Sequence, residues 1–132
     1  GQYNWRNQRS LHVARILVVD DQKNMRTTLA IMLRGAGHDV ASSSTAIEGL
    51  QAVVNSAPDL VILDMVMPKA SGGDTFDRLR QINPAIKVIL CSGYSIDGQA
   101  TQILNRGCDA FIQKPFKKAE LSRKIAYILN EK

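Results

Sequence analysis

Short runs of branched apolar residues recur along the chain. Each is rich in Val, Ile and Leu and is shorter than a typical helix. The runs LVIL and VIL are continuous rather than alternating, as in strands that are buried on both faces of a parallel sheet. These runs predict five strands, at residues 15–20, 39–42, 60–64, 87–92 and 110–113.

The segments between these runs carry apolar residues at helical spacing. In the last segment, Leu121, Ile125 and Ile128 are four and three positions apart and therefore share one face of a helix. Gly37 and Gly107 follow two other segments, at positions where glycine often ends a helix. The pattern predicts five helices, at residues 24–36, 46–56, 75–81, 98–106 and 117–130.

Alternating strands and helices are typical of an α/β protein whose helices cover both faces of a parallel sheet. Right-handed crossovers leave two strand orders, the flavodoxin-like order 2-1-3-4-5 and half of a dinucleotide-binding fold. The first strand is not followed by a GxGxxG turn, and the sequence holds no GxxxxGK[ST] phosphate loop. We therefore predict a flavodoxin-like (βα)5 doubly wound parallel sheet with strand order 2-1-3-4-5.

Composition narrows the class of protein further. The chain has 132 residues, the size of one domain, and its 45% of apolar residues argues against disorder. No apolar run approaches the roughly 20 residues of a membrane helix. Cys91 and Cys108 form no CxxC pair, so we expect two reduced core thiols and a cytoplasmic location.

The net charge of +5 is unevenly distributed. Arg6, Arg9 and Arg15 precede the first acidic residue and give residues 1–15 a charge of +3. A basic leader without a basic stripe behind it is weak support for nucleic-acid binding, so we expect no nucleic-acid partner and no membrane contact. Residues 1–13 lack periodicity, and we expect a linker or leader there, with the folded domain at 14–132.

Polar residues stand at the carboxyl ends of four predicted strands: Asp20 and Asp21, Asp64, Ser92, and Lys114. In a parallel sheet these ends meet along one edge, where open α/β proteins bind ligands. Clustered carboxylates repel each other unless a cation lies between them, and Mg²⁺ prefers such oxygen ligands. A carboxylate nucleophile beside a metal, an ammonium and a hydroxyl suits phosphoryl transfer. Each residue alone has an ordinary explanation as a cap, turn or surface residue, so the joint pattern carries the prediction.

Four motifs sharpen this prediction: ILVVDD, LVILDMVMP, ILCSGY and FIQKPF. With them the chain resembles the receiver domain of bacterial two-component response regulators, of the chemotaxis-regulator type, over about residues 14–131. The run SGYS…GCDAFIQKPF is most similar to receivers appended to hybrid sensor histidine kinases. We therefore expect a C-terminal receiver from such a kinase, although a stand-alone receiver stays possible.

The resemblance implies a role for each residue at the strand ends. Asp64 corresponds to the phosphorylated aspartate. Asp21 corresponds to the direct Mg²⁺ ligand, and Asp20 to its acidic partner, which binds the metal directly or through water. The backbone carbonyl of Val66 would be a further ligand. Lys114 corresponds to the lysine that pairs with the phosphoryl oxygens.

The resemblance also implies a conformational switch. Ser92 corresponds to the hydroxyl that follows the phosphoryl group on activation, and Phe111 occupies the switch-aromatic position. The peptide bond between Lys114 and Pro115 is typically cis in this family. The surface formed by the helix at 98–106, the strand at 110–113 and the helix at 117–130 would then change, and a downstream partner would read it.

The implied phosphoryl donor is a histidine kinase or a histidine phosphotransfer domain, and we expect a monomer or weak dimer. Such a domain catalyses its own phosphorylation and dephosphorylation and is not otherwise an enzyme, although a parent hybrid protein would be a histidine kinase. Two alternatives stay open. A haloacid-dehalogenase-type phosphatase also uses an aspartyl nucleophile and Mg²⁺, but it would want Asp-x-Asp where this chain has Asp20-Asp21-Gln22. A flavin- or nucleotide-binding module would use the same fold.

Overall fold

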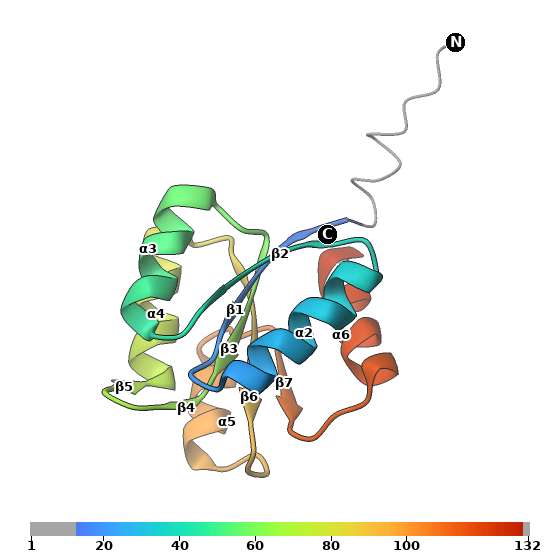
Figure 1. The fold of residues 1–132 in the computed structure, drawn as a ribbon. Coiled ribbons are helices and arrows are strands. Elements are labelled where there is room, and N and C mark those ends of the chain that lie inside the picture. Colours follow the sequence, from blue (N-terminus) through green and yellow to red (C-terminus); the bar gives the residue numbers. More distant parts are fainter. Residues whose placement is uncertain (1–12, 131–132) are drawn as a thin grey trace.

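Five parallel strands form the central sheet of the domain, in the order β2-β1-β3-β6-β7 (Figure 1). The computed structural model describes residues 13–130, so the expected linker or leader lies, apart from Val13, outside the described residues. The strands are β1 (Arg15–Val19), β2 (Asp39–Ser43), β3 (Leu60–Asp64), β6 (Lys87–Ser92) and β7 (Ala110–Gln113). Counted along the chain, these five strands have the order 2-1-3-4-5, so the flavodoxin-like α/β fold is confirmed.

Helices cover both faces of this sheet. They are α2 (Lys23–Gly35), α3 (Ala46–Ser56), α4 (Gly72–Ile82), α5 (Gly98–Asn105) and α6 (Lys118–Asn130). Figure 1 shows α2 and α6 on one face and α3, α4 and α5 on the other. None of the helices between residues 13 and 130 has the length and apolar character of a membrane-spanning segment.

The sheet separates the apolar core into two layers. In β1, Leu17 and Val19 pack on the side of α3, α4 and α5, whereas Ile16 and Val18 pack on the side of α2 and α6. All five positions of β3 are buried, as expected for a continuous apolar run in the middle of a parallel sheet. The layers hold the strands, and therefore the strand ends, in fixed register.

Helix α4 begins earlier than the pattern predicted, at Gly72 rather than at residue 75. Ser71 stands just before it in an extended conformation, and its Oγ accepts a hydrogen bond of 3.0 Å from the Asp74 N–H. This N-cap satisfies one of the free amides of the first turn. A Cβ on Gly72 would lie 3.0 Å from the Met65 Cα, so the glycine allows α4 to start against the end of β3.

The loop after β3 contains a short ladder that the sequence did not predict. Strand β4 (Val66–Met67) pairs antiparallel with β5 (Ala70–Ser71). Lys69 adopts a left-handed conformation, with φ of 63°, in the turn between them. This ladder places Val66 beside the end of β3.

Strand β2 forms one edge of the sheet. The Asp39 N–H donates to the Ala14 carbonyl and the Ser43 carbonyl accepts from Asp20, so the odd-numbered residues of β2 face β1. The N–H and the carbonyl of Val40 therefore point away from β1. The Arg34 Nη2 donates a hydrogen bond of 3.0 Å to the Val40 carbonyl and thus occupies part of this edge.

Candidate functional site

Carboxylates from two neighbouring strands meet at the carboxyl edge of the sheet. Asp20 directly follows β1 and Asp64 ends β3, and these strands are paired. Asp20, Asp21 and Asp64 each offer a carboxylate oxygen, and these oxygens lie within 4.8 Å of one another. Asp20 and Asp64 are 2% and 6% exposed, whereas Asp21 is open to solvent. We call these three residues the acidic cluster.

Lys114, which follows β7, extends its ammonium into the acidic cluster. Its Nζ lies 2.8 Å from Asp20 Oδ2 and 3.7 Å from Asp64 Oδ1. Its backbone N–H donates to the carbonyl of Ser92 at 2.7 Å, and the bond from Lys114 to Pro115 is cis. Residues that are 94 positions apart in sequence thus share one ion pair.

Burial and charge set the ionisation of this group. Burial, and then the neighbouring charge of Asp20, raise the pKa of Asp64 to about 6; Asp21 adds a smaller effect in the same direction. The Val66 N–H and Lys114 partly oppose this rise. Burial by itself would lower the pKa of Lys114, but its hydrogen bond to Asp20 and the charge of Asp64 outweigh burial and raise it. The cluster therefore holds more negative charge than one lysine neutralises.

The backbone around the acidic cluster is held by local hydrogen bonds. Asp20 Oδ1 accepts from the Gln22 N–H at 2.9 Å, and Asp64 Oδ1 accepts from the Val66 N–H at 3.2 Å. The Arg26 Nη1 donates to the Asp20 carbonyl at 2.9 Å. Sequence reasoning did not identify Arg26. Arg26 lies in the first turn of α2, shortly after Asp20 and Asp21, and this nearness in sequence could have suggested a contact with the acidic pair.

Two further residues of the predicted site come from the neighbouring strands β6 and β7. Ser92 ends β6, is 2% exposed, and follows Cys91, the register partner of Asp64. Its Oγ accepts a hydrogen bond of 3.0 Å from the Tyr94 N–H. Phe111 of β7 is half-buried against the apolar layer under α3, α4 and α5. Ser92 therefore lies at the same edge of the sheet as Asp64, and Phe111 lies in the neighbouring strand.

The acidic cluster fits a hard divalent cation. Its donor atoms are oxygens from three separate carboxylates, and two of these carboxylates are buried. Burial, and then the charge of Asp20, raise the pKa of Asp64, and a bound cation would offset that charge. This is the donor chemistry that Mg²⁺ takes in proteins.

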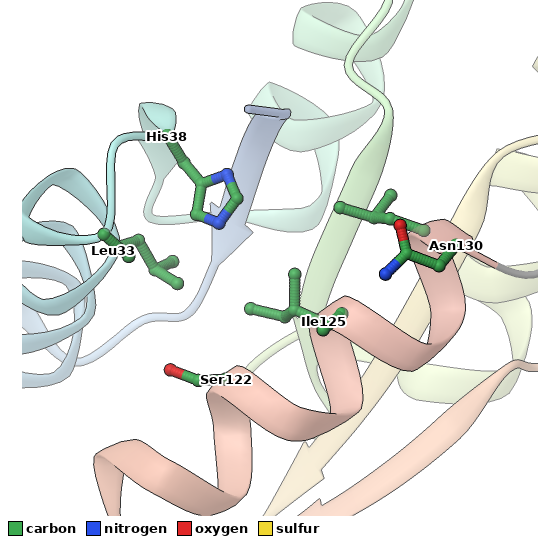
Figure 2. Close-up of a pocket in the computed structure, with 8 residues that line it drawn as sticks. Leu33, His38, Ser122, Ile125 and Asn130 are labelled. Carbon is green, nitrogen blue, oxygen red and sulfur yellow. The ribbon is translucent and has the colours of Figure 1, made fainter. Parts of the chain in front are cut away.

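A cavity lies away from the acidic cluster, between the C-terminal parts of α2 and α6. Figure 2 shows Leu33, His38, Ser122, Ile125 and Asn130 around this cavity, which has a volume of about 100 Å³. The His38 Nδ1 accepts a hydrogen bond of 2.9 Å from the N–H of the residue before β1. The histidine is therefore engaged at the amino end of the strands, away from the acidic cluster.

The two cysteines are structural. Cys91 and Cys108 are both buried and free, which agrees with the predicted core thiols. Burial raises the pKa of the Cys91 thiol to about 12 and that of Cys108 to about 11. Thiols of such high pKa are poor nucleophiles and poor metal ligands at neutral pH.

Comparisons with known sequences agree with this geometry. The family described as "Response regulator receiver domain" matches residues 16–126. The chemotaxis protein CheY of Thermotoga maritima is 32% identical over 108 residues, which cover 81% of this chain and 90% of that protein. The DNA-binding transcriptional regulator NtrC of Azospirillum brasilense is 32% identical over 120 residues, which cover 91% of this chain and 25% of that protein.

Solved structures that resemble this chain are also receiver domains. A response regulator receiver domain protein from Clostridium thermocellum superposes with a TM-score of 0.84 at 31% identity, covering 89% of this chain and 94% of that one. A CheY-like receiver domain protein from Methanospirillum hungatei also gives 0.84, at 30% identity and the same coverage. The chain spans a quarter to a half of the length of the regulators NtrC and PhoP that it matches. The chain therefore belongs to the response regulator receiver family, whose members are phosphoacceptor signalling domains of two-component systems.

Proposed function

We propose that the domain accepts a phosphoryl group from a phosphohistidine onto Asp64. The observation that carries this proposal is a buried carboxylate that shares Lys114 with the second acid, Asp20, at the carboxyl edge of a receiver fold. An oxygen of Asp64 attacks phosphorus as the P–N bond to histidine breaks. The imidazole nitrogen keeps the electron pair of that bond and takes up a proton.

The protein's own side chains prepare Asp64 for this step. With a pKa of about 6, the carboxyl is about nine-tenths ionised at pH 7 and can act as a nucleophile. The Lys114 ammonium, 3.7 Å from Asp64 Oδ1, lies where it can pair with the oxygens of an arriving phosphoryl group. The Val66 N–H donates to the same carboxylate and orients it.

We propose Mg²⁺ as the ion of the acidic cluster. Asp20, Asp21 and Asp64 would hold it, together with the backbone carbonyl of Val66. When bound, the ion supplies positive charge that favours the ionised carboxylates and stabilises the phosphoryl oxygens during transfer. The convergence of three carboxylate oxygens within 4.8 Å supports this assignment.

The same geometry supports a switch at Ser92. Its hydroxyl now accepts from Tyr94, and a phosphoryl group on Asp64 would offer a stronger, charged acceptor for the hydroxyl proton. A shift of Ser92 toward the phosphoryl group opens space that Phe111 enters by rotating inward. The surface of α5, β7 and α6 then changes, and a downstream partner binds it. The donor is a histidine kinase or a histidine phosphotransfer domain, and the two free cysteines favour the reducing cytoplasm as the compartment.

Transfer of labelled phosphate tests the site. The parent chain, incubated with Mg²⁺ and a phosphorylated histidine phosphotransfer domain, should take up label that Asp64→Asn does not. Asp74→Asn is the matched control, because Asp74 is an exposed aspartate outside the acidic cluster and should leave uptake unchanged. Equal uptake by parent and Asp64→Asn would show that another residue is the acceptor.

The alternatives to a receiver gain no support from residues 13–130. Sustained turnover of p-nitrophenyl phosphate would favour a phosphatase, and flavin absorbance in the purified protein would favour a flavin module. The origin in a hybrid histidine kinase stays a prediction from the SGYS…GCDAFIQKPF run, and the gene sequence around this domain tests it.

A further inference from the structure

Arg26 stands in the first turn of α2, where a positive charge does not help the helix. The helix begins at Lys23, its first turn contains no acidic residue, and Gln22 provides no side-chain cap. The helix dipole places partial positive charge at this end, so a guanidinium here weakens the helix rather than stabilising it. What Arg26 contributes to the domain therefore comes from its contacts outside α2.

The guanidinium of Arg26 holds the backbone of the acidic cluster. Its Nη1 donates a hydrogen bond of 2.9 Å to the carbonyl of Asp20, the residue that directly follows β1. The Arg26 side chain is half-buried, and its backbone N–H donates to the Gln22 carbonyl at 3.1 Å. Both the base and the tip of this side chain are therefore fixed, and the bond ties α2 to the end of β1.

The carbonyl that Arg26 holds belongs to the peptide group between Asp20 and Asp21. A peptide group is planar, so a bond to its oxygen restrains the orientation of the whole group. The next peptide group is held as well, because the Gln22 N–H donates to Asp20 Oδ1 at 2.9 Å. Arg26 thus restrains one of the two peptide groups that flank Asp21.

Asp21 depends on its backbone more than the other two acids of the cluster do. Asp20 and Asp64 are buried and share Lys114, whereas Asp21 is open to solvent. Packing limits the directions of a buried side chain, but an exposed one takes its direction mainly from the backbone conformation. The two peptide groups around Asp21 therefore decide whether its carboxylate faces the other two.

We propose that Arg26 is a positioning residue for the cation of the acidic cluster, and that it acts by holding the Asp20–Asp21 peptide group so that the Asp21 carboxylate stays with those of Asp20 and Asp64. This inference deepens the proposed function and rests on it, because it takes Mg²⁺ as the ion of the cluster. Ligands that are held in place before the metal arrives lose less freedom on binding and therefore bind it more tightly.

The charge of Arg26 acts on metal binding in the opposite direction. A guanidinium near the cluster repels a divalent cation, so its charge alone would weaken binding. Glu48 is close enough to respond to this charge: hydrogen bonds from Ser44 and Thr45 lower the pKa of Glu48, and Arg26 adds a smaller effect in the same direction. Removing Arg26 therefore has opposite expected results, weaker Mg²⁺ binding if it positions Asp21 and tighter binding if only its charge matters.

Titration of the whole chain with Mg²⁺ alone, followed by the amide chemical shifts of residues 19–24, tests the inference. Arg26→Met keeps a long apolar stem but removes every N–H donor of the side chain. We expect its dissociation constant for Mg²⁺ to rise about tenfold, the lower end of the effect of removing a group that holds a metal ligand. Arg26→Ala should show the same loss. If either variant binds Mg²⁺ as tightly as the parent, or more tightly, the inference is wrong.

Arg34→Met is the matched control. Arg34 lies on the same helix, and its Nη2 donates to the Val40 carbonyl at 3.0 Å. Val40 pairs in register with Ile16 near the start of β1, whereas the acidic cluster lies beyond the end of that strand. The control therefore removes the same charge and the same kind of bond away from the metal site, and its affinity for Mg²⁺ should equal that of the parent. A tenfold loss here as well would overturn the inference.

A double-mutant cycle tests whether Arg26 acts through Asp21. Asp21→Ala removes the carboxylate that Arg26 is proposed to orient, so adding Arg26→Met to Asp21→Ala should weaken Mg²⁺ binding little further. The same tenfold loss in both backgrounds would show that Arg26 acts by another route and would overturn the inference.

Failure of the proposed ion gives a different result from failure of this inference. A parent chain whose amides at 19–24 do not respond to Mg²⁺ would overturn the proposed ion and the role of Arg26 together. A parent that binds Mg²⁺ no more tightly than Arg26→Met would overturn only the role of Arg26 and leave the proposed function intact.

Discussion

Replacing Asp64 with asparagine should make the domain more stable at neutral pH in the absence of metal. Burial and the charge of Asp20 raise the pKa of Asp64 from 3.8 to about 6. The folded protein therefore binds this proton more tightly than the unfolded chain does, and ionising Asp64 destabilises the folded state. Below about pH 4 the carboxyl is protonated in both states and this penalty is absent.

The size of the effect follows from the raised pKa. Because one pH unit corresponds to about 1.4 kcal/mol, the penalty reaches about 3 kcal/mol once the pH has risen well above 6. At pH 5 the free-energy penalty is roughly half as large. The amide of asparagine carries no charge and fills nearly the same volume, while Lys114 keeps its 2.8 Å ion pair with Asp20.

Urea unfolding in the presence of EDTA measures this difference. At pH 8, Asp64→Asn should unfold with a free energy about 3 kcal/mol larger than the parent, and at pH 5 the gap should fall to about half. Adding Mg²⁺ should stabilise the parent more than the variant, since the variant lacks one of the proposed ligands. Asp74→Asn, an exposed substitution, should show no gap at either pH.

The reasoning is refuted if Asp64→Asn is no more stable than the parent at pH 8. It is also refuted if the gap is the same at pH 5 and pH 8, because the increase with pH is the signature of one carboxyl that loses its proton through about pH 6.

Three further predictions address the rest of the domain. Lys114→Met should lower the free energy of unfolding by about 3 kcal/mol at pH 8 and slow phosphoryl uptake, because it leaves buried carboxylates without their cation; a stable, fully active variant would contradict the site. Gly49→Ala should destabilise by about 1–3 kcal/mol in thermal unfolding, because its Cβ would lie 2.8 Å from a valine methyl of β1, whereas Gly98→Ala, with nothing within 4 Å, should not. Cys91 and Cys108 should react with iodoacetamide at pH 8 far more slowly in the folded protein than in urea, since burial raises the pKa of both thiols; rapid alkylation of the folded protein would show that the core opens.

The sheet and much of the site could be predicted because both depend on patterns that are local in sequence. A continuous apolar run is typical of a central parallel strand, and the residue that follows it must lie at the carboxyl edge. This reasoning brought Asp20, Asp64 and Lys114 together, and in the structure Lys114 forms ion pairs with both aspartates. The strand ends fix the approximate position, and the family motifs supply the expected roles.

Other features depend on packing between elements and are not visible in a local pattern. The pair Gly72 and Gly73 is typical of a loop, because glycine disfavours helices, yet it begins α4 where the chain must pass close to Met65. The bond between Arg106 and Asp77 joins two helices, and hydrophobic periodicity does not specify how two helices are rotated against each other. The β4–β5 ladder is too short to produce an alternating pattern.

The side chain of Arg34 affects how readily another chain can add a strand to the exposed edge of the sheet. An unpaired edge strand offers its peptide groups to any other extended chain, and such pairing is a common route to fibres. In β2 the outward carbonyl of Val40 already accepts a hydrogen bond from the Arg34 guanidinium. A second molecule that approaches this edge must displace the Arg34 guanidinium before it can pair with Val40. Arg34 therefore raises the free-energy cost of adding a strand at this edge.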